Sequence, residues 1–259
     1  MMKIENNSTV VRFEQLPDCL FRIWILPDWD GEDIVWQPGQ FLRLGVLENP
    51  EDRVALRAMT IIDVQEGVFE FYMVSVSQGA TSPRIAQLRV GDRCYMEPKI
   101  TGNFILPNLP QKPNAALWMM GTGTGIAPYL AMLKKGKPFL QKYHTIIFVH
   151  SVQMSKHLCY QKELNEYAKS YANFIYLPIV TREVHIHNGL ERSPLRIPAL
   201  ISNKKLQEYA NQELTAEHSV VMLCGHPGMI KESIQALVRH GLTKHRRRLP
   251  GNIVSERYF

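Results

Sequence analysis

Three glycines spaced two residues apart, Gly121, Gly123 and Gly125, follow an apolar run and precede a helical pattern. Glycines at such a place let a phosphate group approach the backbone N–H groups at the start of a helix. The spacing departs from the dinucleotide fingerprint G-x-G-x-x-G, because Ile126 stands where the third glycine would be. A glycine-rich turn can also arise by chance, but its place directly after a strand favours a nucleotide-binding turn.

Two arginines, Arg182 and Arg196, are expected at the end of a later strand and at the start of a later helix. NAD-binding domains carry an acid near the end of their second strand, which holds the ribose 2′-hydroxyl. Here that strand ends in His150-Ser-Val-Gln-Met, with no acid. An arginine can hold a 2′-phosphate through two N–H groups. The pair therefore favours NADP, although either arginine alone is more often a surface charge.

The first half of the chain offers a second phosphate site. Gly79 to Ser82 lead into a short helix, for which we expect Ser82 as N-cap and Pro83 as the first helical residue. An ordinary capped helix explains this segment equally well when it is taken alone. Two phosphate-binding helix starts, one in each half, predict two nucleotides, and a flavin with a nicotinamide cofactor fits that number.

The chain changes character near residue 105. Before it, short apolar segments separated by Asp-Gly, Pro-Gly and Glu-Gly turns predict strands at 10–13, 20–26, 40–46, 56–64, 68–77 and 93–98. Six strands in about a hundred residues are typical of a small antiparallel β-barrel.

A linker at 108–114 separates this half from a pattern of alternating strands and helices. Continuously apolar strands are expected at 115–120, 145–150, 173–180, 219–224 and 252–256. Such runs are typical of parallel strands buried on both faces, and the alternation predicts a Rossmann-like α/β domain. The predicted fold class is therefore β plus α/β, with domains at 1–107 and 108–259.

Composition places the chain among globular proteins. It has 259 residues, of which 45% are hydrophobic and 21% charged, so disorder, collagen and coiled coil are excluded as its main organisation. The longest apolar run, 115–120, falls far short of the ~18 residues of a membrane span. Four cysteines lie far apart without C-x-x-C spacing, which disfavours a metal site and suggests a reducing compartment. We expect a cytoplasmic protein without a metal or a membrane segment.

The net charge of +6 includes one basic run, made of Lys244, His245, Arg246, Arg247 and Arg248. Such a run suits a solvated helix end, where the helix dipole favours cations. It suits a docking patch for an acidic protein equally well. Nucleic-acid binding is disfavoured because no aromatic residue interleaves with these basic residues.

A series of short motifs resembles the bacterial ferredoxin–NADP⁺ reductases, also called flavodoxin–NADP⁺ reductases, nearly end to end. The motifs are Pro38-Gly-Gln-Phe, Arg57-Ala-Met-Thr, Phe71-Tyr-Met-Val-Ser-Val, Gly79-x-x-Ser-Pro-Arg, Gly91-Asp, Gly121-Thr-Gly-Thr-Gly-Ile-Ala-Pro, Cys224-Gly-His-Pro-Gly-Met and the final Glu256-Arg-Tyr-Phe. Each motif alone is moderately specific, whereas their order and spacing together are strong. The resemblance implies a six-stranded β-barrel FAD domain followed by an NADP(H) domain. It also implies hydride exchange between NADPH and FAD, and single-electron exchange with an acidic ferredoxin or flavodoxin.

The resemblance further implies roles for residues at matching positions. FAD contacts are implied for Arg57, Ala58, Met59, Thr60, Tyr72, Val74, Gly79, Thr81, Ser82, Thr124 and Phe259. NADP(H) contacts are implied for Gly121, Gly123, Gly125, Gln153, Arg182 and Arg196. Glu256, Cys224 and Tyr258 are implied near the reacting rings, and Tyr258 and Phe259 cover the flavin and adenine rings in an order left open. The basic residues Lys244, Arg246, Arg247 and Arg248 are expected to meet the acidic partner.

Two positions depart from the family pattern. Met59 stands where the family has a tyrosine stacked on the flavin, and Gln153 stands where the bacterial pattern has an arginine. We expect Met59 to share a face with Arg57 toward the flavin, the alternative being that it points into the barrel core. Alternative functions are the reductase component of an oxygenase, a general NADPH diaphorase, or a non-catalytic flavin electron conduit in a larger complex. Cysteine spacing disfavours the conduit, and we expect a monomer.

Overall fold

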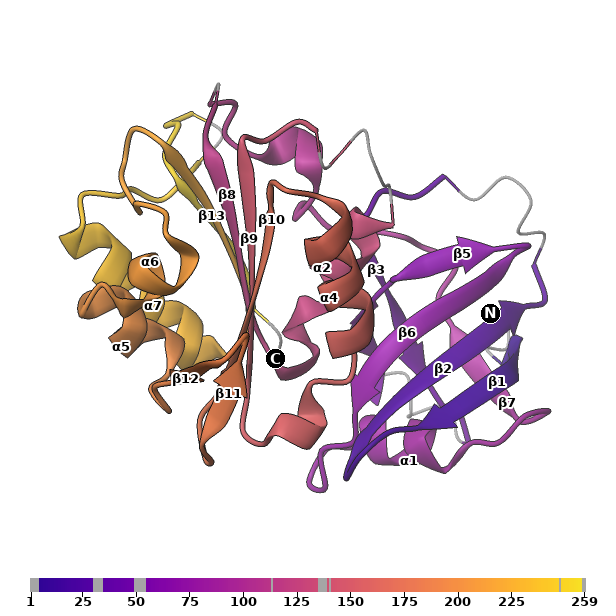
Figure 1. Ribbon diagram of the computed structural model, residues 1–259. Helices are drawn as coiled ribbons and strands as arrows, with labels where there is room; N and C mark the ends of the chain where they lie inside the picture. Colours follow the sequence, from indigo (N-terminus) through magenta and orange to yellow (C-terminus); the bar gives the residue numbers. More distant parts are fainter. Residues whose placement is uncertain are drawn as a thin grey trace. The chain divides into compact units, whose positions relative to one another are not determined.

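The computed structural model describes residues 5–29, 35–48, 55–112, 114–134, 139, 141–246 and 248–257. The chain divides into two compact units. The first runs to Leu106 and also takes in Ala127–Lys134, and the second comprises Pro107–Ile126 and the chain from Lys135 onward. Strands dominate the first unit, whereas strands and helices alternate in the second (Figure 1).

The first unit is a seven-stranded antiparallel sheet with the order β4-β3-β7-β1-β2-β6-β5. Its strands are β1 Ser8–Gln15, β2 Leu20–Pro27, β3 Phe41–Gly45, β4 Arg57–Thr60, β5 Asp63–Gln65, β6 Val68–Val74 and β7 Arg93–Met96. The first and last strands in this order, β4 and β5, are joined through only Ile61 and Ile62. The sheet must therefore curl until its two ends approach each other, as in a barrel.

Alternating side chains build the core of this sheet. Phe21, Ile23 and Ile25 on β2 are buried and pack with Phe69 and Phe71 of β6. This is the inward-facing period of two that the sequence predicted. One strand was predicted wrongly: 56–64 is two strands, because Ile61 and Ile62 are both fully buried and interrupt the alternation.

Helix α1, Ser82–Gln87, begins one residue earlier than predicted. Its N-cap is Thr81, and Pro83 lies in the first turn as expected. Ser82 does not cap because its Oγ accepts a hydrogen bond from the N–H of Val76, at 3.0 Å. The Ser82 side chain therefore fixes the turn that precedes the helix.

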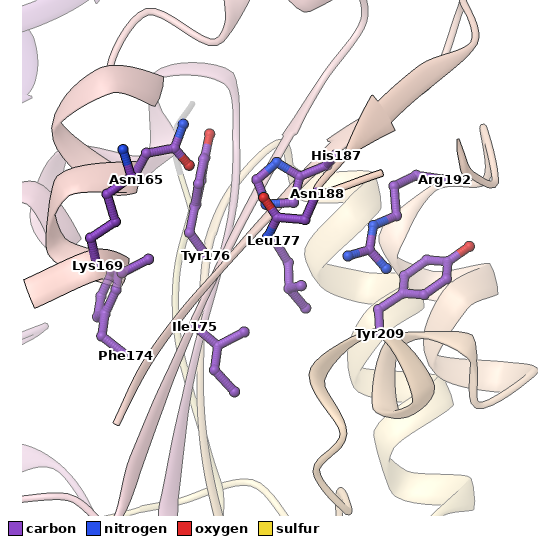
Figure 2. Close-up of a pocket in the computed structure, with 11 residues that line it drawn as sticks. Asn165, Lys169, Phe174, Ile175, Tyr176, Leu177, His187, Asn188, Arg192 and Tyr209 are labelled. Atoms are coloured by element: carbon purple, nitrogen blue, oxygen red, sulfur yellow. The ribbon is translucent and has the colours of Figure 1, made fainter. Parts of the chain in front are cut away.

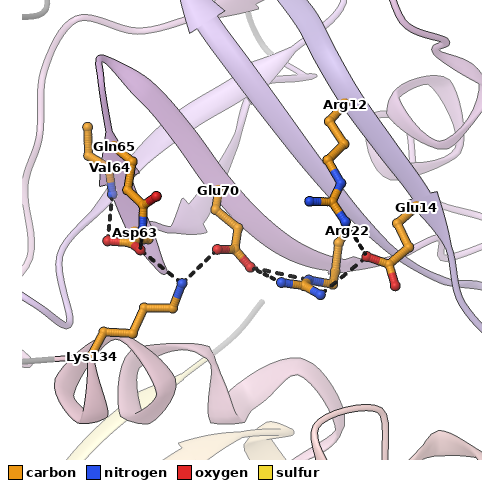
Figure 3. A network of polar contacts seen from close by, with 8 residues as sticks. All are labelled: Arg12, Glu14, Arg22, Asp63, Val64, Gln65, Glu70 and Lys134. Carbon is orange, nitrogen blue, oxygen red and sulfur yellow. Dashed lines mark hydrogen bonds and ion pairs between the residues drawn. The ribbon is translucent and has the colours of Figure 1, made fainter. Parts of the chain in front are cut away.

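A polar network ties helix α2, Ala127–Leu133, to the strands of the first unit (Figure 3). Lys134 follows α2, and its Nζ lies 2.9 Å from Glu70 Oε2 and 2.9 Å from Asp63 Oδ2. Arg22 donates to the other oxygen of Glu70, with Nη2 at 2.7 Å and Nε at 3.2 Å. Both oxygens of this buried carboxylate are thus held by cations.

The second unit is a five-stranded parallel sheet with the order β10-β9-β8-β13-β14. Its strands are β8 Ala116–Thr122, β9 Thr145–Val152, β10 Phe174–Val180, β13 Ser219–Gly225 and β14 Ile253–Arg257. Every predicted strand is present, and the burial of almost every residue in β8, β9 and β13 agrees with a sheet covered on both faces. The Rossmann-like prediction is therefore confirmed.

Helices cover both faces of the parallel sheet (Figure 1). One face carries α5 Ile197–Ser202, α6 Lys205–Ala210 and α7 Pro227–Arg239, whose apolar residues join the large core of this unit. The other face carries α4, Gln161–Ser170, where Tyr167 packs on Phe174. Short 3₁₀ turns lie at Leu106–Asn108 (η2), Gly123–Ile126 (η3) and Ser155–His157 (η4).

A hairpin that was not predicted follows β10. Its strands are β11 His185–His187 and β12 Leu190–Arg192, which pair antiparallel. Asn188 and Gly189 form the turn, with φ of +53° and +75°. Asn-Gly with both φ positive is typical of the tightest hairpin turn, so the signal was present in the sequence.

The basic run does not end a helix, which corrects one of its two interpretations. Helix α7 ends at Arg239, and Lys244 forms an isolated bridge with Ile253 of β14. Arg246 bridges back to Leu249, so this segment is an extended loop beside the sheet. Lys244, Arg246 and Arg248 are exposed, and Arg247 lies outside the described residues.

Three further observations bear on the sequence expectations. All four cysteines are free. Among the residues that the structure describes, no helix has the length and apolarity to cross a membrane. Within the same residues, no cluster of three or more His, Cys, Asp or Glu side chains is arranged to hold a metal ion.

Candidate functional site

The carboxyl ends of the parallel strands bring three predicted site residues into one row. Gly121 of β8 is in register with Cys224 of β13, and Cys224 is in register with Glu256 of β14. On the other side of Gly121 the row continues to His150 of β9. Ligands of such sheets bind outside the carboxyl ends of the strands. We call His150, Gly121, Cys224 and Glu256 the carboxyl-edge row.

The glycine turn packs against the end of β13 so closely that no side chain fits at Gly125. A Cβ on Gly125 would lie 2.7 Å from the carbonyl oxygen of Cys224. Gly123 has φ of +55° and nothing within 4 Å of the position of its missing Cβ. The backbone is therefore held tightly at Gly125. At Gly123 it is open, which leaves space for a phosphate group to approach the backbone N–H groups.

His150 is a member of the row that sequence reasoning did not identify as a site residue. Its side chain is completely buried. Burial lowers the pKa of His150 to about 4, and neither ring nitrogen has a hydrogen-bond partner among the described residues. The imidazole is therefore neutral at pH 7. A histidine in an otherwise apolar strand, level with the glycine turn, is the signal that identifies it.

Glu256 ends the row on the opposite side. Its Oε2 atom is buried and has no hydrogen-bond partner among the described residues. Burial raises the pKa of Glu256 to about 7, so this carboxyl gains or loses a proton at neutral pH. Cys224 beside it is fully buried. Tyr258 and Phe259, which follow Glu256 closely, lie outside the described residues.

Gln153 and Arg182 meet where β9 and β10 end. The N–H of Arg182 donates to the carbonyl of Gln153, at 2.9 Å, and both residues are exposed. Arg196 is exposed as the N-cap of α5. Thr124 is buried within the η3 turn. Both arginines expected at the 2′-phosphate are thus exposed, and the carboxylate of Glu183, next to Arg182, accepts a hydrogen bond from the N–H of Ser155 just beyond β9.

In the first unit, strand β4 carries the predicted Arg57, Ala58, Met59 and Thr60. Arg57 and Ala58 are exposed, whereas Thr60 is buried. Met59 is half-buried, lies opposite Leu42 of β3 and packs against the barrel core. The structure therefore supports the core-facing alternative for part of the Met59 side chain.

The remaining predicted residues of the first unit flank the turn before α1. Gly79 donates its N–H to the carbonyl of Val76, at 2.7 Å. The Thr81 hydroxyl donates to the carbonyl of Ala55, which ties this turn to the segment before β4. Tyr72 is buried on β6, and Val74 at the end of that strand is half-buried.

Comparisons with known proteins agree with this layout. Residues 119–235 match the family model described as the oxidoreductase NAD-binding domain. The chain is 33% identical to the flavodoxin/ferredoxin–NADP reductase of Buchnera aphidicola (subspecies Baizongia pistaciae), over 85% of this chain and 87% of that protein. It is 32% identical to the Escherichia coli K12 protein of the same name, over 88% and 87%.

This chain belongs to the flavodoxin/ferredoxin–NADP reductase family. A crystal structure of a ferredoxin NADP⁺ reductase from Neisseria gonorrhoeae, with bound FAD and NADP, matches it with a TM-score of 0.86 and 28% identity. The match covers 98% of each chain. The predicted reductase fold, an antiparallel sheet followed by a five-stranded parallel sheet, is therefore confirmed for both units.

Proposed function

We propose that the protein is a flavoenzyme that transfers electrons between NADPH and a ferredoxin or flavodoxin through FAD. The carboxyl-edge row carries this proposal, because it joins an open glycine turn to a carboxyl group whose buried Oε2 has no hydrogen-bond partner among the described residues. A turn of this kind binds a dinucleotide phosphate. A partnerless carboxyl group with a pKa near neutrality is typical of a reaction centre rather than of a structural ion pair.

Bound FAD would accept a hydride from NADPH and release its electrons one at a time, chemistry that no side chain supplies. The protein contributes alignment of the two rings and exclusion of water. In the first unit, we propose that Arg57 and the Gly79–Ser82 turn bind the FAD phosphates. Tyr72 and Val74 would line the flavin ring, and Tyr258 and Phe259 would cover the flavin and adenine rings, one each.

In the second unit, we propose that Gly121, Gly123 and Gly125 receive the NADP diphosphate. Arg182 and Arg196 would bind the 2′-phosphate, and both side chains are exposed and available for it. Gln153, which adjoins Arg182, supplies no charge there. Glu256 would hold or release a proton at Oε2 near the reacting rings, with Cys224 beside it in the row.

We further propose that the acidic partner docks on Lys244, Arg246, Arg247 and Arg248. Three of these residues are exposed on one extended loop, which supports a docking surface. Four free cysteines fit a reducing environment, and we infer a cytoplasmic location and a monomeric enzyme.

The test is the absorption spectrum of the purified protein, followed anaerobically on addition of NADPH or NADH. We expect bound FAD that NADPH bleaches about a hundredfold more efficiently than NADH. Two charge-assisted contacts of roughly 1.5 kcal/mol each give this ratio. The double variant Arg182→Gln/Arg196→Gln should lose most of the preference, whereas the exposed control Arg239→Gln should keep it. A protein that takes up no FAD on incubation would overturn the proposal.

A further inference from the structure

A cavity of about 550 Å³ lies at the free edge of the parallel sheet, away from the carboxyl-edge row. It is lined by four consecutive residues of β10, by α4, by the β11–β12 hairpin and by Tyr209 of α6 (Figure 2). Its β10 residues are 174–177, whereas Arg182 lies beyond Val180, where that strand ends. The cavity is therefore separate from the residues proposed to bind NADP, and its volume suits a small organic molecule.

The hairpin buries a histidine and an arginine and leaves apolar side chains exposed. Val184 and Ile186 are 72% and 65% exposed. His187 and Arg192 are buried, at 6% and 5% exposed. Packing alone favours the opposite arrangement, since buried arginine is rare unless it is paired. The two buried polar side chains thus call for an explanation other than core formation.

Arg192 has no carboxylate partner among the described residues, and its Nε makes no hydrogen bond there. Its guanidinium stacks on the ring of Tyr209, at 4.3 Å from the centroid, and extends toward the cavity (Figure 2). The Tyr209 hydroxyl accepts a hydrogen bond from the N–H of Ser193, at 3.0 Å, which fixes the ring. A buried cation held in place without its counter-charge is costly unless an anion completes the site.

Further polar groups converge on the same cavity. The buried hydroxyl of Tyr176 has no hydrogen-bond partner among the described residues. His187 packs edge-on against Tyr176, with ring centroids 5.7 Å apart. Lys169 of α4 adds a second positive charge, and none of the described residues that line the cavity is an aspartate or a glutamate. The remaining walls are two asparagines, Asn165 and Asn188, and apolar side chains that include Phe174 and Leu177.

We propose that this cavity binds a small organic anion, whose carboxylate or phosphate group pairs with Arg192 and whose apolar body lies against Tyr176 and Phe174. The positive charge of Lys169, on the other side of these β10 side chains, adds to the attraction of an anion (Figure 2). Arginine offers a planar fork of N–H donors that fits both kinds of oxyanion. The Tyr176 hydroxyl supplies a further hydrogen bond. The inference does not depend on the proposed reductase function, because none of the cavity residues is placed in that machinery.

The test is titration of the purified protein with phenyl phosphate, benzoate and the neutral control benzamide, by calorimetry and ¹H–¹⁵N NMR. We expect saturable binding of at least one of the two anions and none of benzamide. The amide signals of Lys169, Asn188 and Gly189 should shift. Binding of phenyl phosphate alone identifies a phosphorylated ligand, and binding of benzoate identifies a carboxylate.

Variants decide where the anion binds. Arg192→Gln should weaken binding at least tenfold and Arg192→Lys less, because lysine keeps the charge and loses the fork. Lys169→Gln, at an exposed helix position that leaves the fold intact, should weaken it about threefold. Arg239→Gln should have no effect. Absence of saturable binding would overturn the proposal, as would binding that survives Arg192→Gln and Lys169→Gln but is lost in Arg182→Gln/Arg196→Gln.

Discussion

The two units treat a buried carboxylate in opposite ways. In the first unit both oxygens of Glu70 are held by Arg22 and Lys134, within 2.7 to 2.9 Å (Figure 3). In the second unit the buried Oε2 of Glu256 has no partner among the described residues, and burial raises its pKa to about 7. The carboxylate of Glu70 is thus held by two cations, whereas the carboxyl group of Glu256 can gain or lose a proton near neutral pH.

This difference separates groups that hold the fold from groups available for chemistry. A buried charge whose partners are in place contributes to structure, because its hydrogen bonds and ion pairs are already made within the protein. A buried group without partners is a cost that folding alone does not explain. Among the residues that the structure describes, Arg192 Nε and Glu256 Oε2 are buried without a hydrogen-bond partner, and both lie in the unit with the parallel sheet.

The largest expected effect is on the partnered carboxylate. Glu70→Ala should lower the free energy of unfolding by about 3 kcal/mol, because it removes the buried carboxylate that Arg22 and Lys134 share. Each cation then keeps its second, more exposed carboxylate partner, which is Glu14 for Arg22 and Asp63 for Lys134. The expected loss is near the low end of the usual range, since Lys134 is 36% exposed. Denaturant unfolding measures it.

The matched control Glu97→Ala breaks the more exposed pair with Arg43 and should cost below about 1 kcal/mol. Equal losses of unfolding free energy in the two variants would show that the buried ion pairs of Glu70 stabilise the fold no more than an exposed ion pair does.

His150 should make the second unit sensitive to acid. Its pKa is about 4 in the folded protein and 6.5 in the unfolded chain, so the unfolded state binds more protons between these values. Stability is therefore fully present above pH 6.5 and falls as the pH drops toward 4, by about 3 kcal/mol for a shift of this size. In His150→Leu the free energy of unfolding should fall less steeply than in the wild type as the pH drops from 6.5 to 4. The exposed control His218→Gln should keep the wild-type pH dependence. A wild-type pH dependence in His150→Leu would contradict the assigned pKa.

The exposed cations Arg246 and Arg248 differ from both kinds of buried charge, and a charge reversal tests their role. Arg246→Glu/Arg248→Glu should slow reduction of flavodoxin about tenfold at low salt, and less at physiological salt, where charges beyond about 8–10 Å are screened. Stopped-flow measurement of flavodoxin reduction gives the rate. Reduction of a small neutral quinone should not change, nor should flavodoxin reduction in the control Lys231→Glu/Arg239→Glu on α7. Equal slowing with both acceptors would make the loop structural.

Glu256→Gln should act on pH dependence rather than on folding. The folded pKa near 7 lies above the ordinary 4.5, so the folded state binds more protons between these values. The contribution of Glu256 to stability is therefore present below pH 4.5 and is lost as the pH rises through 7. The rate of flavin reduction by NADPH should inflect near pH 7 in the wild type and be flat there in Glu256→Gln. An inflection that persists in the variant would assign the proton to another group.

The smallest effect is expected at Met59, which packs partly on the barrel core. Sulfur against an aromatic ring gives about 0.3–1.5 kcal/mol, close to the roughly 0.5–1.5 kcal/mol of aromatic stacking. Met59→Tyr should therefore tighten FAD binding less than tenfold, and Met59→Ala should weaken it more than Met59→Leu. Fluorescence titration of the apoprotein with FAD measures these affinities. Affinity indifferent to all three changes would show that Met59 contacts the core alone.

Strands of the second unit could be predicted from sequence because burial on both faces leaves a continuous apolar run, as at Thr145–Val152. Barrel strands were harder, since Ile61 and Ile62 are apolar like the strands around them and conceal the break between β4 and β5. The β11–β12 hairpin was missed because its apolar residues Ile186 and Leu190 are exposed, whereas apolar residues of a strand are usually buried.

The candidate site was predicted as far as local motifs reach. Gly121, Cys224 and Glu256 were identified from separate motifs, and their common row depends on strand order, which no local pattern specifies. His150 and Arg192 were missed because a single polar residue in an apolar or irregular segment has no periodic signature. Only the register shows that His150 is level with Gly121.

The most direct test of the central claim is the number of flavodoxin molecules reduced for each NADPH consumed. NADPH, the purified protein with FAD and an excess of oxidised flavodoxin are mixed without oxygen, and both species are followed by absorbance. A hydride carries two electrons and flavodoxin takes one at a time, so the account predicts two flavodoxins reduced per NADPH. Consumption of NADPH that reduces the bound FAD but never flavodoxin or ferredoxin would contradict it.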